Sequence, residues 1–272
     1  MLIDFHTHIF PDKIAAATVR ALAASGNTHP YTDGTRAGLS AAMEEGGADI
    51  AVNLPVLTSP AQFESVLGFA ARLCGDFAAT GRGILSFAGV HPAQSDIKAV
   101  MRRIRDAGFL GIKIHPEYQD TFIDSEESYR LLAAAKENGL ITVTHAGVDI
   151  AFRGRAVRCS PERTARVLDR LGGYSELVLA HLGGAELLDE VMAHLAGREV
   201  YLDTAYVLPE APREELLALI GRHGAERILF ATDSPWQDIR AERDRLRALG
   251  LPAADENMIL YQNAKRLLRI PG

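Results

Sequence analysis

The sequence predicts an α/β fold, a (β/α)8 barrel that occupies residues 1–272 as a single domain. Short apolar runs alternate with longer amphipathic segments along the whole chain. The runs are rich in Val, Ile, Leu and Ala with little polar alternation, which is typical of parallel strands covered on both faces. Eight such runs in 272 residues match the size of one barrel.

Each strand is predicted from one of these runs. In chain order the predicted strands cover residues 2–6, 49–54, 84–90, 111–115, 140–145, 177–181, 199–203 and 227–232. An open, doubly wound sheet is the competing architecture, but it normally has a Gly-rich phosphate turn after the first strand. The corresponding turn here is His6-Thr7-His8, which favours the barrel.

The segments between the strands show helix signals. Asp124 followed by Glu127 resembles a capping box, and Ser160-Pro161 offers an N-cap with proline at the first helical position. Further helices are expected after Pro11, Pro60, Ser95, Ala185 and Pro209, and the last over about 256–268.

Charge and composition exclude several classes of protein. With 29 Lys and Arg against 35 Asp and Glu, the net charge is −6, so nucleic acid is a disfavoured partner. Two cysteines are too few for a disulfide framework or a Cys-based zinc site. We expect no signal peptide and no membrane span, and therefore a cytoplasmic protein; no oligomeric state is predicted.

The histidines are the clearest functional signal. Six of the nine stand at or just after the end of a predicted strand: His6, His8, His91, His115, His145 and His181. The carboxyl ends of barrel strands converge on one face, where active sites are built. His6 and His8 are two residues apart and should share a strand face, with Asp4 on the same face as an acceptor behind them.

Together with Thr144-His145-Ala146-Gly147, the segment from Ala180 to Gly184 and Ala231-Thr232-Asp233-Ser234-Pro235, this pattern resembles the amidohydrolase superfamily of metal-dependent hydrolases. It is most similar to the branch that holds TatD-like hydrolases and metal-dependent decarboxylases. The resemblance runs in strand order over nearly the whole chain.

The resemblance implies a divalent metal ion bound by His6, His8, His145 and Asp233. Three imidazoles and a carboxylate suit zinc, with manganese or iron as alternatives; one ion is expected, and a second is the alternative. Asp233 would also move the proton of the attacking water, whereas its structural alternative is a helix N-cap. His181 would hydrogen-bond the substrate or water, or bind the second metal ion.

The fourth strand departs from the TatD-like pattern, which has a glutamate near this place. Lys113 and His115 share a strand face here, and Glu117 follows Pro116. In some members of the superfamily a carboxylated lysine on this strand bridges two metal ions. We expect Lys113 and His115 to hold a substrate carboxylate or carbonyl; the alternative for Lys113 is a buried ion pair with Asp4 or Asp203.

Two further positions are candidates for substrate binding. His91 resembles a residue near the substrate in TatD-like proteins, or is a loop histidine bonded to the backbone. Arg153 belongs to a segment with five arginines and one glutamate, residues 153–166, which would attract an anionic substrate. The alternative is a solvated loop and helix face.

The function that follows is a metal-dependent hydrolase that uses activated water on a small-molecule amide, ester or lactone. A non-oxidative decarboxylase with the same ligands is the second candidate. A TatD-like nuclease is a third, which the acidic balance disfavours. The expected partner is a small molecule, with an anionic one favoured by the arginines.

Overall fold

The computed structural model describes residues 1–271, apart from the side chain of Asp76. Its strands are parallel to their neighbours and form one run of three and one of six, in the order β1-β2-β3 and β4-β5-β6-β7-β8-β9. They are β1 (Ile3–Thr7), β2 (Ile50–Asn53), β3 (Gly83–Ser86), β4 (Ala88–Gly89), β5 (Gly111–Ile114), β6 (Ile141–Thr144), β7 (Leu177–Leu179), β8 (Tyr201–Asp203) and β9 (Ile228–Leu229).

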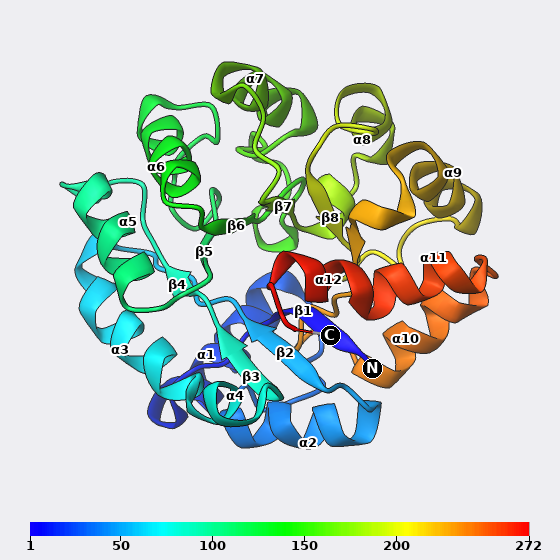
Figure 1. Ribbon diagram of the computed structural model, residues 1–272, viewed down its shortest axis with the longest axis horizontal. Helices are drawn as coiled ribbons and strands as arrows, with labels where there is room; N and C mark the ends of the chain where they lie inside the picture. The colour runs from blue at the N-terminus through cyan, green and yellow to red at the C-terminus, as the bar shows by residue number, and fades with distance from the viewer. Residues whose placement is uncertain (272) are drawn as a thin grey trace.

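Backbone hydrogen bonds join the two runs into a closed barrel. Between β3 and β4, Phe87 N–H donates to Asn53 O at 3.0 Å, so the two segments are one strand interrupted at a single residue. On the other side, Phe5 N–H donates to Phe230 O at 2.9 Å, which places β1 beside β9. The predicted (β/α)8 barrel is therefore confirmed, with its third strand broken (Figure 1).

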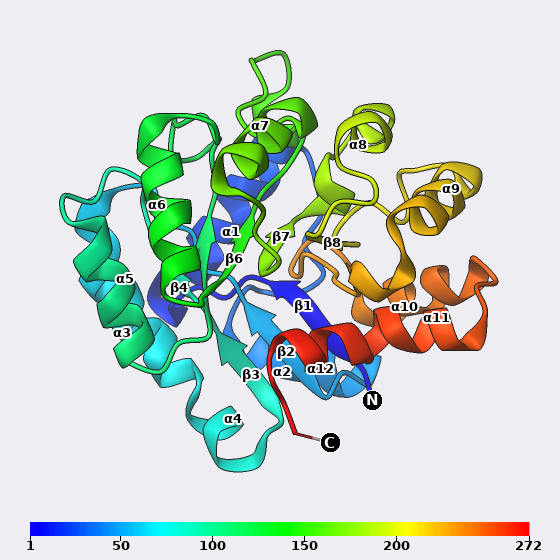
Figure 2. The same ribbon diagram turned by 45° about the horizontal axis from the view of Figure 1, so that its top comes forward.

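Helices surround the strands in both ribbon views (Figures 1 and 2). They are α1 (Asp12–Gly26), α2 (Arg36–Gly46), α3 (Phe63–Leu73), α4 (Gly75–Thr80), α5 (Ile97–Asp106), α6 (Glu126–Glu137), α7 (Pro161–Leu171), α8 (Leu188–His194), α9 (Arg213–His223), α10 (Ile239–Ala248), α11 (Ala253–Asn257) and α12 (Asn263–Leu267). Within the described chain, none of them combines the length and the apolar character that crossing a bilayer requires.

The predicted helix starts have different outcomes. Ser160 caps α7 as expected, because its hydroxyl accepts the N–H of Arg163 at 3.3 Å. The capping box at Asp124 is wrong: Ser125 caps α6 by accepting from Ser128 N–H at 3.2 Å. Asp124 instead accepts hydrogen bonds from two arginines of α7, a contact between helices that a local motif does not reveal.

Strand side chains alternate between two apolar cores. One core, with Ile112 and Leu202, includes the buried faces of the helices and lies between helices and strands. The other, with Val143 and Tyr201, lies around the barrel axis and also takes in Leu267 of α12. Figure 1 shows α12 crossing the end of the barrel where the two chain termini lie.

The inner layer also positions the polar residues. His145 follows Val143 by two residues and Asp203 follows Tyr201 by two, so both continue the inward-facing side of their strands. These positions lie at the carboxyl ends of the strands, at the end of the barrel opposite α12.

Candidate active site

His6, His8 and Asp233 meet at the carboxyl end of β1 and β9. The Nε2 atoms of the two histidines are 3.2 Å apart. Oδ1 of Asp233 lies 3.4 Å from Nε2 of His6 and 3.1 Å from Nε2 of His8. One ligand-type atom from each residue therefore lies within 4.8 Å of the others, a spacing at which they could hold a metal ion.

Oxygen acceptors fix the tautomers of both histidines. Nδ1 of His6 lies 2.9 Å from Oδ2 of Asp203, and Nδ1 of His8 lies 2.8 Å from the carbonyl oxygen of Leu54. Because the carbonyl and the ionised carboxylate can only accept, each Nδ1 carries the proton. The lone pairs on Nε2 are left facing Asp233, which is the arrangement of metal-binding histidines.

Asp4 does not take the place expected for it behind His6. The register of β1 against β2 shifts between Asp4 and Thr7, so simple alternation fails there. Asp4 accepts from the backbone N–H of His6 at 3.2 Å and from the Thr232 hydroxyl at 2.6 Å, and burial raises its pKa to about 7. Asp203 holds the His6 ring instead.

Lys113 is almost fully buried and lies directly beside this group. Its Nζ is 3.1 Å from Nε2 of His6. Burial lowers the pKa of Lys113 to about 8, while Asp203 and Asp233 oppose that shift. Among the described residues, the ion pair with Asp4 or Asp203 that was the alternative for Lys113 is not observed; Lys113 contacts His6 instead, which puts an ammonium group inside the site.

His181 connects this group to His145. Nδ1 of His181 lies 2.8 Å from the carbonyl oxygen of Ala205, so the proton is on Nδ1. Nε2 of His181 then accepts from Nδ1 of His145 at 3.0 Å. This leaves Nε2 of His145 buried without a hydrogen-bond partner. A buried lone pair of this kind fits a metal ligand.

A second group of ligand-type atoms contains His115, His145 and Asp149, again within 4.8 Å of one another. Nε2 of His115 lies 3.4 Å from Oδ2 of Asp149, and the two imidazole rings stack at 4.3 Å with 11° between their planes. Sequence reasoning missed Asp149. Its signal was a carboxylate in the loop that directly follows the strand 140–145.

Two of the predicted catalytic residues have a left-handed backbone. The φ angles are 57° at His181 and 63° at Asp233. Such values are uncommon outside glycine, and strained residues cluster at functional sites. The local N-cap proposed as an alternative for Asp233 is not observed, because Asp238 caps α10.

His91 and Arg153 lie in different surroundings. His91 accepts the backbone N–H of Ala93 on Nδ1 at 3.1 Å, the loop contact expected as the alternative. Arg153 is 61% exposed and pairs with Glu186 of the next loop. The role of either residue in binding substrate remains a prediction.

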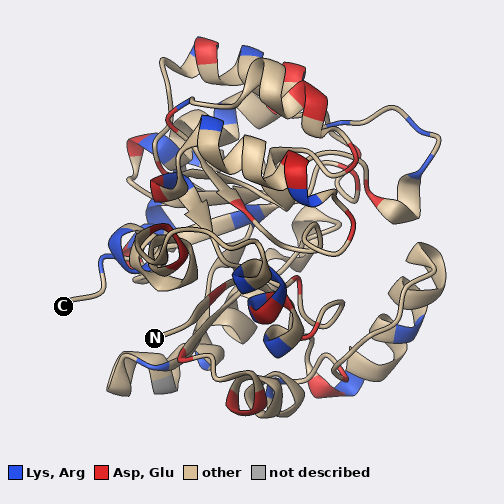
Figure 3. Cartoon of the chain, turned by 90° about the vertical axis from the view of Figure 1, so that its right-hand side faces the viewer, with Lys and Arg blue, Asp and Glu red and all other residues tan. Residues whose placement is uncertain are grey.

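The arginine-rich segment is largely neutralised by carboxylates from outside it. Arg158 pairs with Asp120, and Arg163 and Arg166 pair with Asp124. Figure 3 shows basic and acidic segments side by side over the outer helices. The excess of positive charge counted along the sequence is therefore not a basic patch in the fold.

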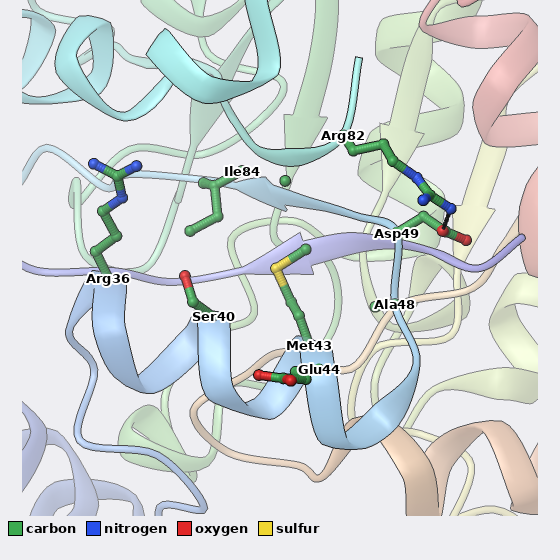
Figure 4. Close-up of a pocket in the computed structure, with 9 residues that line it drawn as sticks. Arg36, Ser40, Met43, Glu44, Ala48, Asp49, Arg82 and Ile84 are labelled. Atoms are coloured by element: carbon green, nitrogen blue, oxygen red, sulfur yellow. Dashed lines mark hydrogen bonds and ion pairs between the residues drawn. The ribbon is translucent and has the colours of Figure 1, made fainter. Parts of the chain in front are cut away.

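A surface pocket lies away from these residues. It is lined by Met43 and Ile84, with Arg36 and Arg82 near its two ends (Figure 4). Gly83 begins β3, so this pocket is at the amino ends of the strands, on the opposite side of the barrel from the histidines. We assign it no part in the chemistry.

Comparison with known proteins agrees with this geometry. The family model described as Amidohydrolase matches residues 3–270. The chain belongs to the amidohydrolase family. This confirms the resemblance drawn from the strand-end motifs. No protein among the curated sequences matches this chain.

Solved structures match this amidohydrolase over nearly its whole length. A TIM-barrel protein from Bordetella bronchiseptica is 18% identical, covers 98% of each chain and has a TM-score of 0.74. A dihydroxybenzoic acid decarboxylase from Polaromonas sp. JS666, with bound manganese and 2-nitroresorcinol, is 16% identical and has a TM-score of 0.70. The match covers 99% of this chain and 97% of the decarboxylase. The 5-carboxyvanillate decarboxylase from Sphingomonas paucimobilis is 18% identical, covers 99% of each chain and has a TM-score of 0.66. At these identities the likeness is one of fold.

Proposed function

We propose that this amidohydrolase is a metal-dependent hydrolase of small molecules with an amide, ester or lactone bond. Four residues would hold one divalent ion: His6, His8, His145 and Asp233. The observation that carries the proposal is the set of Nε2 lone pairs around Asp233, together with the unpartnered Nε2 of His145. Zinc suits this donor set, and manganese and iron are the alternatives.

The metal ion would supply Lewis acidity, polarising a substrate carbonyl and lowering the pKa of water. Asp233 would act as the base. Burial raises the pKa of Asp233, but His6 and His8 in their protonated forms outweigh burial and hold the pKa below its ordinary value. An ionised Asp233 can accept a proton from the attacking water and return it to the leaving group.

The remaining residues would bind and stabilise the substrate. The ammonium group of Lys113 faces the same space as Asp233 and would hold a carbonyl or carboxylate oxygen. His181 and His115 would contact the substrate or the attacking water. We expect a small, anionic substrate and a cytoplasmic location, and no role for nucleic acid.

A non-oxidative decarboxylase is the second candidate function. The buried ammonium of Lys113 would suit a substrate carboxylate. Two of the structures that share the fold are decarboxylases of hydroxylated aromatic acids. The four ligands and the substrate-binding residues would serve this reaction equally well.

Metal analysis and product analysis test the proposal together. The chelated protein is reloaded with zinc, manganese or iron and its metal counted by mass spectrometry. It is then assayed on esters, lactones and amides and on 2,6-dihydroxybenzoate and 5-carboxyvanillate in H2¹⁸O. We expect one metal ion per chain and ¹⁸O in the product. The variant His8→Ala should lose the metal ion. The control His194→Ala, at an exposed histidine on a helix, should keep it.

Asp233→Asn should lower kcat by about 10²–10⁴-fold, because it removes the proton acceptor. Release of CO2 without ¹⁸O incorporation would select the decarboxylase. A count of two ions, with one lost in Asp149→Asn, would assign a second ion to His115, His145 and Asp149. A chain that binds none of the three metals would contradict the proposal.

A further inference from the structure

We infer that Asp149 is a positioning residue: one carboxylate both anchors the loop after β6 and orients the buried ring of His115. We call residues 149–158 the cover loop. The loop follows the strand-end histidine of β6.

The two oxygens of Asp149 point in different directions. Oδ1 accepts the backbone N–H of Ala151 at 2.8 Å and so caps the short 3-10 turn Ile150–Phe152. Oδ2 faces inward and contacts the His115 ring, 3.4 Å from Nε2. Asp149 is only 9% exposed, so water has little access to either contact. Moving the turn would therefore move the acceptor of the His115 ring.

Aromatic rings also connect the turn to His115. The ring of Phe152, at the end of the turn, meets Tyr118 edge to face at 5.0 Å, and Tyr118 meets His115 edge to face at 4.6 Å. Such edge-to-face pairs are favourable beyond the burial of their surface. The turn and the His115 ring are thus packed as one unit.

The middle of the cover loop is held much more weakly. Arg153 and Glu186 form an ion pair between exposed side chains, a type that contributes little to stability. A Cβ on Gly154 would meet no atom within 4 Å. At the far end, Oε1 of Glu117 accepts the N–H of Arg158 at 2.8 Å. Two buried carboxylates therefore anchor the ends of the loop, and only Asp149 also contacts His115.

The contact with Asp149 favours one tautomer of His115. A buried carboxylate oxygen 3.4 Å from Nε2 favours the proton on that atom. Nδ1 of His115 is then a buried lone pair without a partner, available to a substrate or water. Loss of the carboxylate would release the ring to rotate or change tautomer.

Asp149→Asn and Asp149→Ala separate the two roles. Asparagine keeps an oxygen for the turn, since it is a good N-cap, but removes the carboxylate from His115. We expect ¹⁵N chemical shifts of His115 to show a single tautomer in the wild type and a mixture in both variants. Hydrogen exchange of residues 150–152 should stay near wild type in Asp149→Asn and accelerate about tenfold in Asp149→Ala.

Asp120→Asn is the matched control, because Asp120 pairs with Arg158 at the surface and its side chain is 87% exposed. It should leave the His115 tautomer and the exchange of 150–152 unchanged. Should Asp149→Ala fail to fold, the His115 tautomer in Asp149→Asn tests the inference by itself.

The inference would be overturned if the ¹⁵N shifts of His115 in Asp149→Asn were the same as in the wild type. Loss of a metal ion in that variant would also overturn it, because Asp149 would then be a metal ligand. Only the kinetic readout rests on the proposed function: Asp149→Asn should lower kcat with little change in KM. Exchange and NMR need no substrate, so failure of the proposed reaction and failure of this inference are distinguishable.

Discussion

Single oxygen atoms behind the rings determine what the histidines can do. Asp203 holds the proton of His6 on Nδ1, and the carbonyl oxygen of Ala205 does the same for His181. Each bond leaves the opposite nitrogen as a lone pair. The strand-end histidines could be identified from the sequence, but their acceptors could not, because Asp203 is 197 residues from His6 and Ala205 is 24 residues from His181.

Glu242 allows a prediction about pH at the residue scale. Its side chain is fully buried, Oε1 pairs with Arg245, and Oε2 has no partner. Burial raises its pKa from 4.5 to about 7, against the opposing effect of Arg245. Because the folded pKa lies above the unfolded one, the stability it contributes is complete below pH 4.5 and is lost as pH rises through about 7.

Glu242→Gln should remove the loss of stability at higher pH, because glutamine does not ionise. With about 1.4 kcal/mol for each pH unit, the rise of the pKa from 4.5 to about 7 sets an upper limit of about 3.5 kcal/mol. We expect the variant to melt several degrees above wild type at pH 8 and near wild type at pH 4.5. Glu137→Gln, at an exposed glutamate of α6, is the control. An equal difference at both pH values would contradict the prediction.

At the scale of elements, loops after neighbouring strands contact each other closely. Gly147 follows β6 and bridges to Ala185 in the loop after β7. A Cβ on Gly147 would lie 2.1 Å from the backbone nitrogen of Ala185, and its φ is +86°. Only glycine meets both conditions without strain, so this contact determines how the loop beyond His145 begins.

Gly147→Ala and Gly154→Ala form a matched pair. Both glycines have φ near +80°, but Gly154 has open space around its Cα. Each substitution should cost about 1–2 kcal/mol for a left-handed alanine, and Gly147→Ala about 1–3 kcal/mol more for the clash. Thermal unfolding of both variants measures the difference. Equal melting temperatures would show that the backbone at Ala185 moves away without destabilising the fold.

At the scale of the whole molecule, two cores lie one inside the other. The helices cover the outer core, and α12 covers the end of the inner core with Leu267, which is 8% exposed. The candidate active-site residues lie at the opposite end of the barrel. The last helix therefore contributes to the stability of an interior that it shares with the strands of the site.

Leu267→Ala tests this contribution. Truncating a buried leucine costs about 2–5 kcal/mol, so the melting temperature should fall by roughly 5–15 °C for a chain of this size. Gln262→Ala, at an exposed position just before α12, should change it little. Similar melting temperatures for the two variants would mean that the inner core does not depend on α12.

The sequence by itself determined the barrel and the strand ends that carry the site. Apolar periodicity and the placing of His6, His8, His145, His181 and Asp233 are local properties, and a barrel brings strand ends together whatever its details. Only the tertiary structure decided the partners: Asp203 rather than Asp4 behind His6, Asp149 beside His115, and the carboxylates that neutralise the arginines. Those choices depend on register and on how loops after different strands fold over one another, which no spacing along a single segment encodes.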